Sequence, residues 1–202
     1  MQATLHNIGK QFGKKWIFKG LNFTFETAQH SAITGGNGSG KSTILLMLAG
    51  YITPTSGRIE WTKNGSNITH QELFAHIALA SPYLELIEEF SLEEMLQFQL
   101  KFKSYLSGIT VGQLVELSGL ADSKNKPLKH FSSGMKQRVK LLLAIMSSAD
   151  LVLLDEPCSN LDKNAVEWFQ SLKHNYGANR SFIICSNHNI TEYPDVERIL
   201  SI

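Results

Sequence analysis

The pattern of apolar and polar positions predicts strands in two different environments. Leu21, Phe23 and Phe25 alternate with polar residues, which is typical of a strand with one buried face. Residues 151–154 and 182–185 are instead continuously apolar, as expected for parallel strands covered on both faces. The pattern also predicts short strands at residues 31–34, 58–62, 77–80 and 198–202.

Helix-capping signals place helices between these strands. Ser91-Leu-Glu-Glu94 is a capping box that predicts a helix over residues 92–106, and Thr110-Val-Gly-Gln113 predicts another that ends near Gly119. Residues 121–130 are polar and typical of a loop. Residues 85–130 therefore look like a small helical subdomain inserted between two parts of a sheet domain.

A further helix begins after Phe131. Ser132 and Ser133 are both candidate N-caps, and Val139, Leu142 and Met146 recur behind them at helical spacing. A capped helix N-terminus attracts anions, although most helix starts of this kind are purely structural.

Composition narrows the class of protein. A chain of 202 residues with 43% hydrophobic residues suits one domain with a buried core. Its 19 Lys and Arg against 18 Asp and Glu show no basic excess, which argues against a nucleic-acid partner. Cys158 and Cys185 match neither a disulfide framework nor zinc-ligand spacing and suggest a reducing, cytosolic compartment. The apolar run 44–49 is too short to span a membrane, so membrane work would require another chain.

The most informative stretch is Gly35–Ser42, which reads G-x-x-x-x-G-K-S between a predicted strand and a predicted helix over residues 43–49. Strand, glycine-rich turn and helix form a phosphate-binding loop, in which backbone N–H groups and the helix N-terminus face phosphate oxygens. Lys41 would reach the terminal phosphates, and the Ser42 hydroxyl would ligate Mg²⁺. The sequence therefore predicts a bound nucleotide triphosphate with Mg²⁺.

Two more predicted strands end in polar groups, Asp155-Glu156 and Asn187-His188. Open α/β sheets bind ligands at the carboxyl ends of their strands, so one nucleotide would meet all three strand ends. Asp155 would hold the Mg²⁺ shell, Glu156 would orient or deprotonate the attacking water, and His188 would contact the γ-phosphate. Phe12 lies in a turn ahead of the loop and either stacks on adenine or covers the core.

In these motifs the chain resembles the nucleotide-binding subunit of an ATP-binding cassette (ABC) transporter. The phosphate loop matches the Walker A motif, and Leu151-Val-Leu-Leu-Asp155-Glu156 matches Walker B with its catalytic glutamate. Phe131-Ser-Ser-Gly-Met135 stands where the family carries its Leu-Ser-Gly-Gly-Gln signature. Ser159-Asn-Leu-Asp162 matches the D-loop, His188 the switch histidine and Phe12 the adenine-stacking aromatic.

The resemblance implies an α/β P-loop NTPase fold of the ABC ATPase type. Its mostly parallel sheet would be flanked by helices, with an N-terminal antiparallel β part and the helical insertion at 85–130, in one domain over residues 1–202. The implied nucleotide-binding residues are Phe12, Gly35, Gly36, Asn37, Gly38, Ser39, Gly40, Lys41, Ser42, Thr43, Ser132 and Gly134. The implied catalytic residues are Glu156 and His188.

The resemblance also implies the partners. Two copies would form a head-to-tail homodimer that sandwiches two ATP molecules, with Ser132 and Gly134 touching the γ-phosphate held by the other copy. Transmembrane permease subunits would be driven by this dimer, which would lie in the cytoplasm at the inner face of the cell membrane.

The chain departs from the family pattern at three places. Ser133 replaces a signature glycine, and Met135 replaces the signature glutamine. The strand at 77–80 is followed by Ser81-Pro82 where the family places a glutamine. We hypothesise that the Ser81 hydroxyl partly replaces that glutamine as a metal or water ligand, so the predicted metal ligands are Ser42, Asp155 and Ser81.

Alternative functions remain. A soluble, non-transport ABC ATPase is one alternative, although the chain shows neither a second cassette nor a coiled-coil insertion. A phosphate-loop kinase or GTPase is another alternative, although the Asn-Lys-x-Asp motif of a GTPase is missing. A module that binds ATP without hydrolysing it fits poorly with Lys41, Asp155, Glu156 and His188. The compact length also resembles haem-exporter ATPase subunits.

Overall fold

The computed structural model describes residues 1–187 and 192–202, which divide into two compact units. The first unit comprises Met1–Leu79, Ala149–Glu156 and Asn179–Ile202, and the second comprises Ala80–Ser148 and Pro157–Ala178. The predicted helical insertion at 85–130 falls within the residue range of the second unit.

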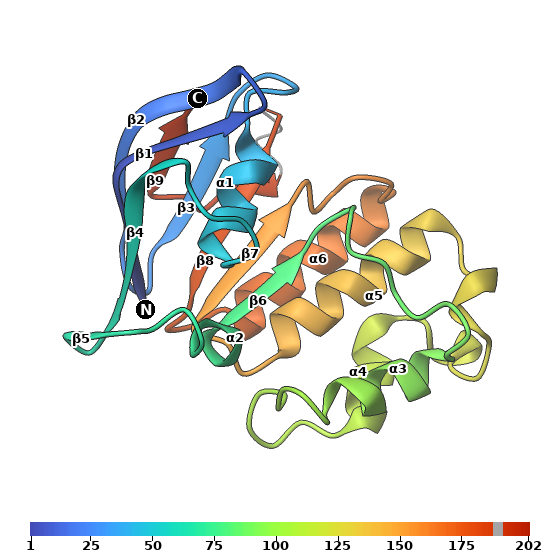
Figure 1. Ribbon diagram of the computed structural model, residues 1–202. Helices are drawn as coiled ribbons and strands as arrows, with labels where there is room; N and C mark the ends of the chain where they lie inside the picture. Colours follow the sequence, from blue (N-terminus) through green and yellow to red (C-terminus); the bar gives the residue numbers. More distant parts are fainter. Residues whose placement is uncertain (188–191) are drawn as a thin grey trace. The chain divides into compact units, whose positions relative to one another are not determined.

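The first unit contains an antiparallel sheet in the order β2-β1-β4-β5 (Figure 1). Its strands are β1 (Gln2–Phe12), β2 (Lys15–Phe25), β4 (Ser56–Lys63) and the short β5 (Ser66–Asn67). Phe25 is buried and Asn22 is exposed, so the alternation in β2 gives the predicted strand with one buried face. The predicted N-terminal antiparallel part is therefore confirmed.

A second sheet has the order β6-β7-β8-β3-β9. Its strands are β6 (Ile77–Ala80), β7 (Leu151–Asp155), β8 (Ser181–Ser186), β3 (His30–Thr34) and β9 (Arg198–Ser201). Strand β3 pairs in parallel with both β8 and β9, and β7 pairs in parallel with β8. Every residue of β7 and β8 is buried, which confirms the interpretation of the two continuously apolar runs.

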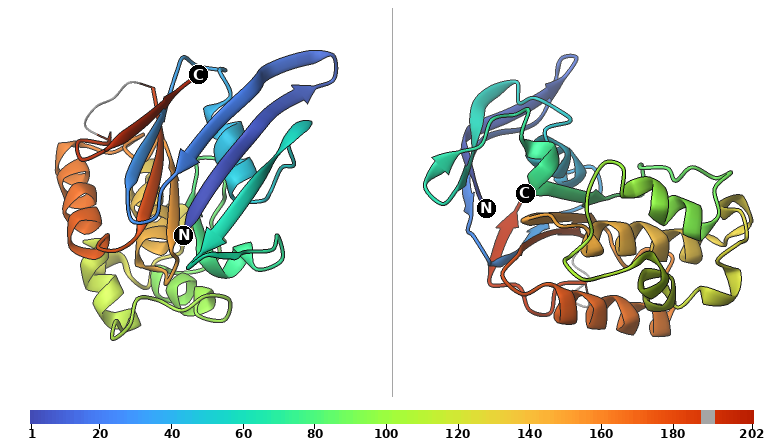
Figure 2. Two further views of the ribbon diagram at one scale, coloured as in Figure 1. Left: turned by 90° about the vertical axis from the view of Figure 1, so that its left-hand side faces the viewer. Right: turned by 90° about the horizontal axis from the view of Figure 1, so that it is seen from below.

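Helix α1 (Lys41–Leu48) packs between the two sheets of the first unit (Figures 1 and 2). Its Ile44 and Leu48 belong to one buried cluster that also contains Leu5 of β1 and Ile183 of β8. The Trp61 indole N–H donates to the Leu48 carbonyl at 3.1 Å, which joins β4 to the end of the helix. The helix is apolar on most of its surface because it is covered from both sides. The unit also contains the short helix α2 (Leu73–His76).

The second unit is helical. It contains α3 (Leu92–Gln99), α4 (Val111–Ser118), α5 (Ser133–Met146) and α6 (Lys163–Tyr176), with two 3₁₀ turns at Ala121–Ser123 and Leu128–His130. Both predicted capping boxes form in full, at Ser91 and Thr110. Gly119 ends α4 in a left-handed conformation with φ 65°. The sequence signals for the starts of α3 and α4 and for the end of α4 are thus confirmed.

The predicted helix over 92–106 is wrong in length, since α3 ends at Gln99. The chain beyond it pairs with the last residue of α5 and with the segment that follows: the Leu106 N–H donates to Met146 O at 2.8 Å, and the Ser148 N–H donates to Ser104 O at 2.8 Å. The buried Tyr105 hydroxyl turns back to donate to Leu96 O at 2.9 Å. These long-range bonds replace the helical bonds that the local pattern favours.

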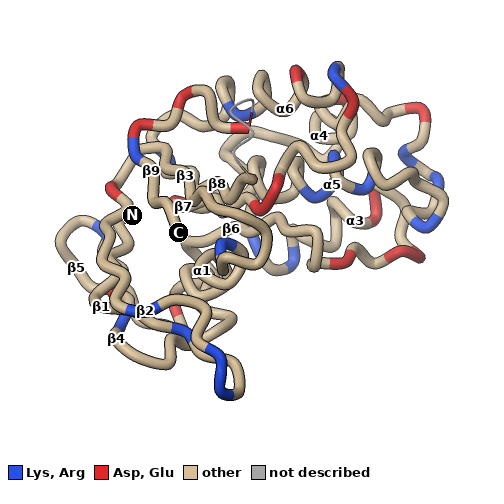
Figure 3. The backbone as a smooth tube through the Cα atoms, turned by 90° about the horizontal axis from the view of Figure 1, so that it is seen from above, with Lys and Arg blue, Asp and Glu red and all other residues tan. Residues whose placement is uncertain are grey.

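Helices α5 and α6 run alongside each other (Figure 2). The Trp168 indole of α6 donates to Leu117 O at 2.7 Å, and the buried Gln137 amide of α5 donates to Pro157 O at 3.0 Å. Both acidic and basic residues occur on the helices of this unit (Figure 3), but the charged residues of α3 are all acidic and those of α5 are all basic. Within the described ranges, no helix has the length and apolar content needed to cross a bilayer.

Candidate nucleotide-binding site

The glycine-rich loop lies where the sequence predicts it, between β3 and α1. Gly38 and Gly40 have φ values of 78° and 107°, a backbone region that side chains with a Cβ atom rarely adopt. A Cβ atom on Gly40 would also stand 2.6 Å from Cγ2 of Ile17. Glycine at position 40 is therefore required for backbone conformation and for space.

Lys41 lies at the first turn of α1 with 5% of its surface exposed. Its ammonium group donates to the carbonyl oxygens of Gly35 and Gly36, both at 3.0 Å. The side chain thus folds back over the loop and holds its positive charge within the curve of the backbone. Because an ammonium group is a strong donor on a flexible stem, a phosphate oxygen is an equally suitable partner for it at this place.

The carboxyl ends of β3, β8 and β7 lie together at one edge of the sheet, as predicted. Thr34 is in register with Ser186, and Cys185 is in register with Asp155. The Ser42 hydroxyl donates to Oδ1 of the buried Asp155 at 3.1 Å, although the two residues are 113 positions apart. The strand-end arrangement inferred from the apolar runs is confirmed.

This pair of oxygen donors fits Mg²⁺. A hydroxyl and a carboxylate are hard ligands of the kind that magnesium prefers in phosphoryl-transfer sites, where phosphates and waters complete the shell. The described residues contain no cluster of three or more His, Cys, Asp or Glu arranged for a metal ion. Ser42 and Asp155 are therefore suited to share a metal ion with a phosphate ligand.

Glu156 has a left-handed backbone conformation with φ 45°, which is uncommon for a residue with a long side chain. Its N–H donates to Cys185 O at 2.9 Å, and its carboxylate accepts a hydrogen bond from the Asn187 amide at 2.6 Å. Such a conformation costs about 1 kcal/mol or more and is often found at functional sites. Asn187 thus positions the predicted catalytic carboxylate, a role that the sequence interpretation did not assign. His188 lies outside the described residues.

Cys185 stands beneath the loop and has no exposed surface. Its thiol donates weakly to Lys41 O at 3.4 Å. Burial raises the pKa of this thiol well above its ordinary value, and the Asp155 carboxylate raises the pKa further. The residue therefore remains a neutral packing group.

Phe12 lies at the end of β1 and is 51% exposed. The Lys10 ammonium stands 5.1 Å from the centre of its ring. An exposed aromatic face is available for stacking, which is consistent with the predicted contact to adenine, and Phe12 is not a core residue.

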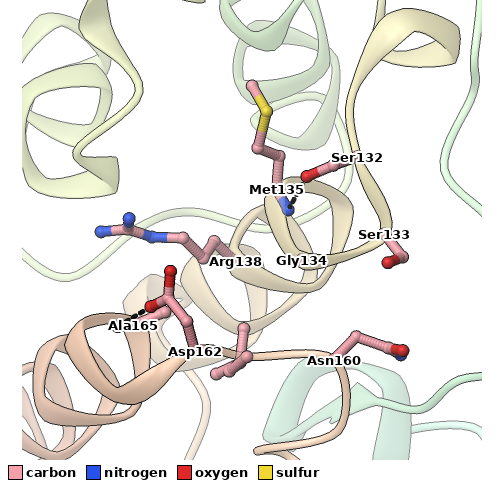
Figure 4. Close-up of a pocket in the computed structure, with 9 residues that line it drawn as sticks. Ser132, Ser133, Gly134, Met135, Arg138, Asn160, Asp162 and Ala165 are labelled. Atoms are coloured by element: carbon pink, nitrogen blue, oxygen red, sulfur yellow. Dashed lines mark hydrogen bonds between the residues drawn. The ribbon is translucent and has the colours of Figure 1, made fainter.

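The second unit has its own pocket, of about 270 Å³, at the N-termini of α5 and α6 (Figure 4). It is lined by Ser132, Ser133, Gly134, Met135, Arg138, Asn160, Leu161, Asp162 and Ala165. We call it the signature pocket. It brings the predicted signature segment and the predicted D-loop together within one unit.

Capping side chains build both walls of the signature pocket. Ser132 is the N-cap of α5, and its hydroxyl accepts the Met135 N–H at 3.2 Å. Asp162 is the N-cap of α6, and its carboxylate accepts the Ala165 N–H at 2.8 Å. A Cβ atom on Gly134 would stand 2.8 Å from Asn160 O, so the glycine lets the D-loop backbone approach α5. The choice between Ser132 and Ser133 as N-cap is thereby settled for Ser132.

Arg138 also lines the signature pocket, and the sequence interpretation did not single it out. Its guanidinium carbon stands 4.6 Å from the centre of the Trp168 ring. Burial lowers the pKa of Arg138, and the Asp162 carboxylate opposes that effect. The sequence did contain a signal that could have identified Arg138: it is an arginine on a helix face that otherwise carries apolar core residues.

Ser81 lies at the end of β6 and is 2% exposed. Its hydroxyl accepts the Tyr83 N–H at the long distance of 3.4 Å. Ser81 belongs to the second unit, whereas Ser42 and Asp155 belong to the first. Its role as a metal or water ligand stays a prediction.

A phosphate-binding loop, a strand-end carboxylate and the two-sheet arrangement define a P-loop ATPase cassette. The chain belongs to the ABC transporter family, because the sequence model of that family matches residues 18–159. It is thus an ATP-binding protein of that family, which confirms the resemblance seen in its motifs.

Named relatives cover most of the chain. It is 30% identical to the cytochrome c biogenesis ATP-binding export protein CcmA of Brucella abortus, over 93% of this chain and 86% of that protein. It is 27% identical to the lantibiotic transport ATP-binding protein SrtF of Streptococcus pyogenes, over 93% and 80%. It is 29% identical to the uncharacterized ABC transporter ATP-binding protein YcbN of Bacillus subtilis, covering 95% of this chain and 62% of YcbN.

Solved structures share the fold. The ATP-binding cassette MJ0796, in a dimeric post-hydrolysis state bound to ADP and phosphate, matches with a TM-score of 0.83 at 22% identity over 99% of this chain and 94% of that one. A bacterial Atm1-family ABC exporter with ATP bound matches with a TM-score of 0.83 at 22% identity. That match covers all of this chain but 37% of the exporter.

Proposed function

We propose that this chain hydrolyses ATP with Mg²⁺ and energises transport through separate transmembrane subunits. One observation carries the proposal: the Ser42 hydroxyl meets the Asp155 carboxylate at 3.1 Å, next to a loop that holds the Lys41 ammonium inward. Two oxygens suited to a metal ion and one cation suited to phosphate support the proposal, because phosphoryl transfer requires such groups.

The loop residues bind and orient the phosphates. Lys41 exchanges its bonds to the Gly35 and Gly36 carbonyls for phosphate oxygens, while loop N–H groups and the α1 N-terminus supply further positive potential. Magnesium, when bound, neutralises charge on the phosphates. Ser42 and Asp155 would hold the metal ion, and the exposed Phe12 ring would stack on the base.

Glu156 orients the attacking water and accepts its proton. Its carboxylate is held by the Asn187 amide, and its backbone is held by Cys185 O, so the side chain approaches the strand edge in a defined position. His188, two residues from the end of β8, contacts the γ-phosphate.

The signature pocket serves the ATP of a second copy. The α5 N-terminus offers the backbone N–H groups of a capped helix, which suit an anion. Ser132 and Gly134 would contact the partner's γ-phosphate in a head-to-tail homodimer. Dimeric structures of the similar cassette MJ0796 support dimerisation.

The helical insertion at 85–130 passes the opening and closing of this dimer to the transmembrane subunits, which hold the chain at the inner face of the membrane. The names of SrtF and CcmA support a transport role over a non-transport ATPase. A haem-exporter-type subunit is the second candidate. The observation in its favour is the 30% identity to an export protein of cytochrome c biogenesis.

The deciding experiment is Glu156→Gln. This variant keeps the Asn187 contact as an amide pair but removes the proton acceptor, so we expect steady-state ATP hydrolysis to fall by about 100-fold or more. ATP binding should be unchanged, and a closed dimer should accumulate with ATP and Mg²⁺ in size-exclusion chromatography.

Glu116→Gln is the matched control, because it makes the same change on an exposed carboxylate of α4. It should leave turnover and oligomeric state unaltered. A Glu156→Gln variant that remains monomeric with ATP and hydrolyses it at the normal rate would contradict both the role of the glutamate and the ATP sandwich.

A further inference from the structure

Two lysines of α5 bind the segment that comes after β6, residues 81–91, which we call the tethered loop. The Lys140 ammonium donates to Ser81 O at 3.4 Å and to Pro82 O at 3.2 Å. The Lys136 ammonium forms an ion pair with Glu88. Lys136 and Lys140 are four residues apart and so lie one above the other on the same face of the helix.

The end of the tethered loop is attached to the chain that enters α5. The Lys129 N–H donates to Glu88 O at 2.9 Å, and the Leu128 N–H donates to Phe90 O at 2.8 Å. The N-cap residue Ser132 lies three residues further along the chain. The tethered loop is therefore joined to the middle of α5 at its beginning, to the first turn of α5 through Lys136 and to the chain that enters α5 at its end. All these contacts lie within the second unit.

The beginning of the loop is held by a side chain as well as by the backbone. Ser81 O accepts the Leu84 N–H at 3.2 Å in addition to the Lys140 ammonium, and Pro82 O accepts the Lys140 ammonium at 3.2 Å. A lysine ammonium has three donors and can satisfy two successive carbonyls at once. Burial lowers the pKa of Lys140, and the neighbouring Glu85 opposes that effect, so the cation is held among acceptors in a partly dry position.

We propose that Lys140, assisted by Lys136, is a positioning residue that makes the tethered loop and the Ser132–Met135 turn move as one body. A change at the signature pocket is then transmitted to residues 81–91, and a force on that loop is transmitted back to Ser132. This inference rests on the proposed function, since it concerns how ATP binding at the signature pocket is communicated.

The test uses amide hydrogen exchange of the full chain in the Glu156→Gln background, with and without ATP and Mg²⁺. Lys140→Met removes the ammonium while keeping the length of the stem, Lys140→Arg restores a cation, and Lys126→Met removes the same charge from an exposed lysine of the same unit. Three peptides report separately: residues 33–45 for nucleotide binding, 131–137 for the signature turn and 82–91 for the tethered loop.

We expect ATP to slow exchange in all three peptides of the Lys126→Met control. In Lys140→Met, ATP should still protect 33–45 and 131–137, but protection of 82–91 should fall by about 5-fold to 10-fold, and Lys140→Arg should restore most of it. Equal protection of 82–91 in Lys140→Met and in the control would overturn the tether.

Failure of the proposed function gives a different result. If ATP protects neither 33–45 nor 131–137 in the control, the proposed function is wrong. The role of Lys140 is then tested by hydrogen exchange without nucleotide. Residues 82–91 should exchange faster in Lys140→Met than in Lys126→Met, and equal exchange rates would refute the proposed role of Lys140.

Discussion

The phosphate loop and the signature pocket hold ligand-binding groups in opposite ways. In the loop between β3 and α1 the polar side chains are held by internal bonds: Lys41 bonds to two loop carbonyls and Ser42 bonds to the buried Asp155, while the α1 N-terminus has no side-chain cap. The signature pocket is an open space of about 270 Å³ whose walls are two helix N-termini. Ser132 and Ser133 are both exposed at its rim.

This difference indicates a division of labour. A loop whose cation and hydroxyl are already held by internal bonds can exchange those bonds for phosphate oxygens without rebuilding the backbone. The signature pocket is open between two capped helix N-termini, so its phosphate would come from a second copy. We therefore expect changes in the loop to affect the binding of ATP itself, and changes in the pocket to affect dimer closure and hydrolysis after ATP has bound.

The largest expected effect is at Lys41. Lys41→Ala removes the cation that is enclosed by the loop, so ATP affinity should fall by about 100-fold or more, measured by calorimetry in the presence of Mg²⁺. Lys126→Ala, an exposed lysine, is the control and should bind normally. If Lys41→Ala bound ATP with unchanged affinity, the loop would not be the part of the chain that determines ATP binding, and the proposed contrast with the signature pocket would be wrong.

Gly134→Ala tests the pocket. Its Cβ atom would stand 2.8 Å from the Asn160 carbonyl, so α5 and the D-loop turn must separate, at a cost of about 1–3 kcal/mol in unfolding free energy. ATP hydrolysis should fall at least about 10-fold while ATP affinity stays within about 2-fold, because the phosphate loop is untouched.

Gly112→Ala provides the matched control for this substitution. Its Cβ atom would have no neighbour nearer than 4.0 Å, within the first turn of α4, so the gain in helix propensity should stabilise the protein by up to about 1 kcal/mol. Chemical denaturation of the two variants should thus give changes of opposite sign. A loss of ATP affinity in Gly134→Ala would show that the two regions are not separable.

Ser132→Ala sharpens the comparison at a single hydrogen bond. Losing the N-cap of α5 should lower the unfolding free energy by about 1 kcal/mol, measured by urea denaturation. Ser133→Ala changes an exposed hydroxyl at the next position and should leave stability unchanged. Equal destabilisation by both substitutions would contradict the assignment of Ser132 as the cap.

The smallest expected effect is at Ser81. If its hydroxyl serves the metal or the water, Ser81→Ala should raise the Mg²⁺ concentration for half-maximal ATP hydrolysis by a few-fold, and Ser81→Gln should restore it. Superimposable Mg²⁺ titrations of wild type and Ser81→Ala would show that the Ser81 hydroxyl serves neither the metal nor the water.

Local patterns predicted much of this protein from the sequence. The buried strands β7 and β8, the loop Gly35–Ser42 and the capping boxes at Ser91 and Thr110 all depend on residues close together in the chain. Their physical signals are short-ranged: continuous apolar runs, glycines that permit positive φ, and side chains that cap their own helix. The proposed chemistry of the phosphate loop rests on the same kind of local signal.

Only the tertiary structure decided the rest. It ended α3 at Gln99, because Leu106 pairs with the last residue of α5 and Ser104 pairs with Ser148 just beyond it. It brought Ser42 to Asp155 and Asn187 to Glu156, and it joined Lys140 to Ser81 and Pro82. Each of these contacts links residues at least 31 positions apart, and their energies depend on how strands and helices pack. A one-dimensional pattern contains the donors and acceptors, but packing in three dimensions determines which of them meet.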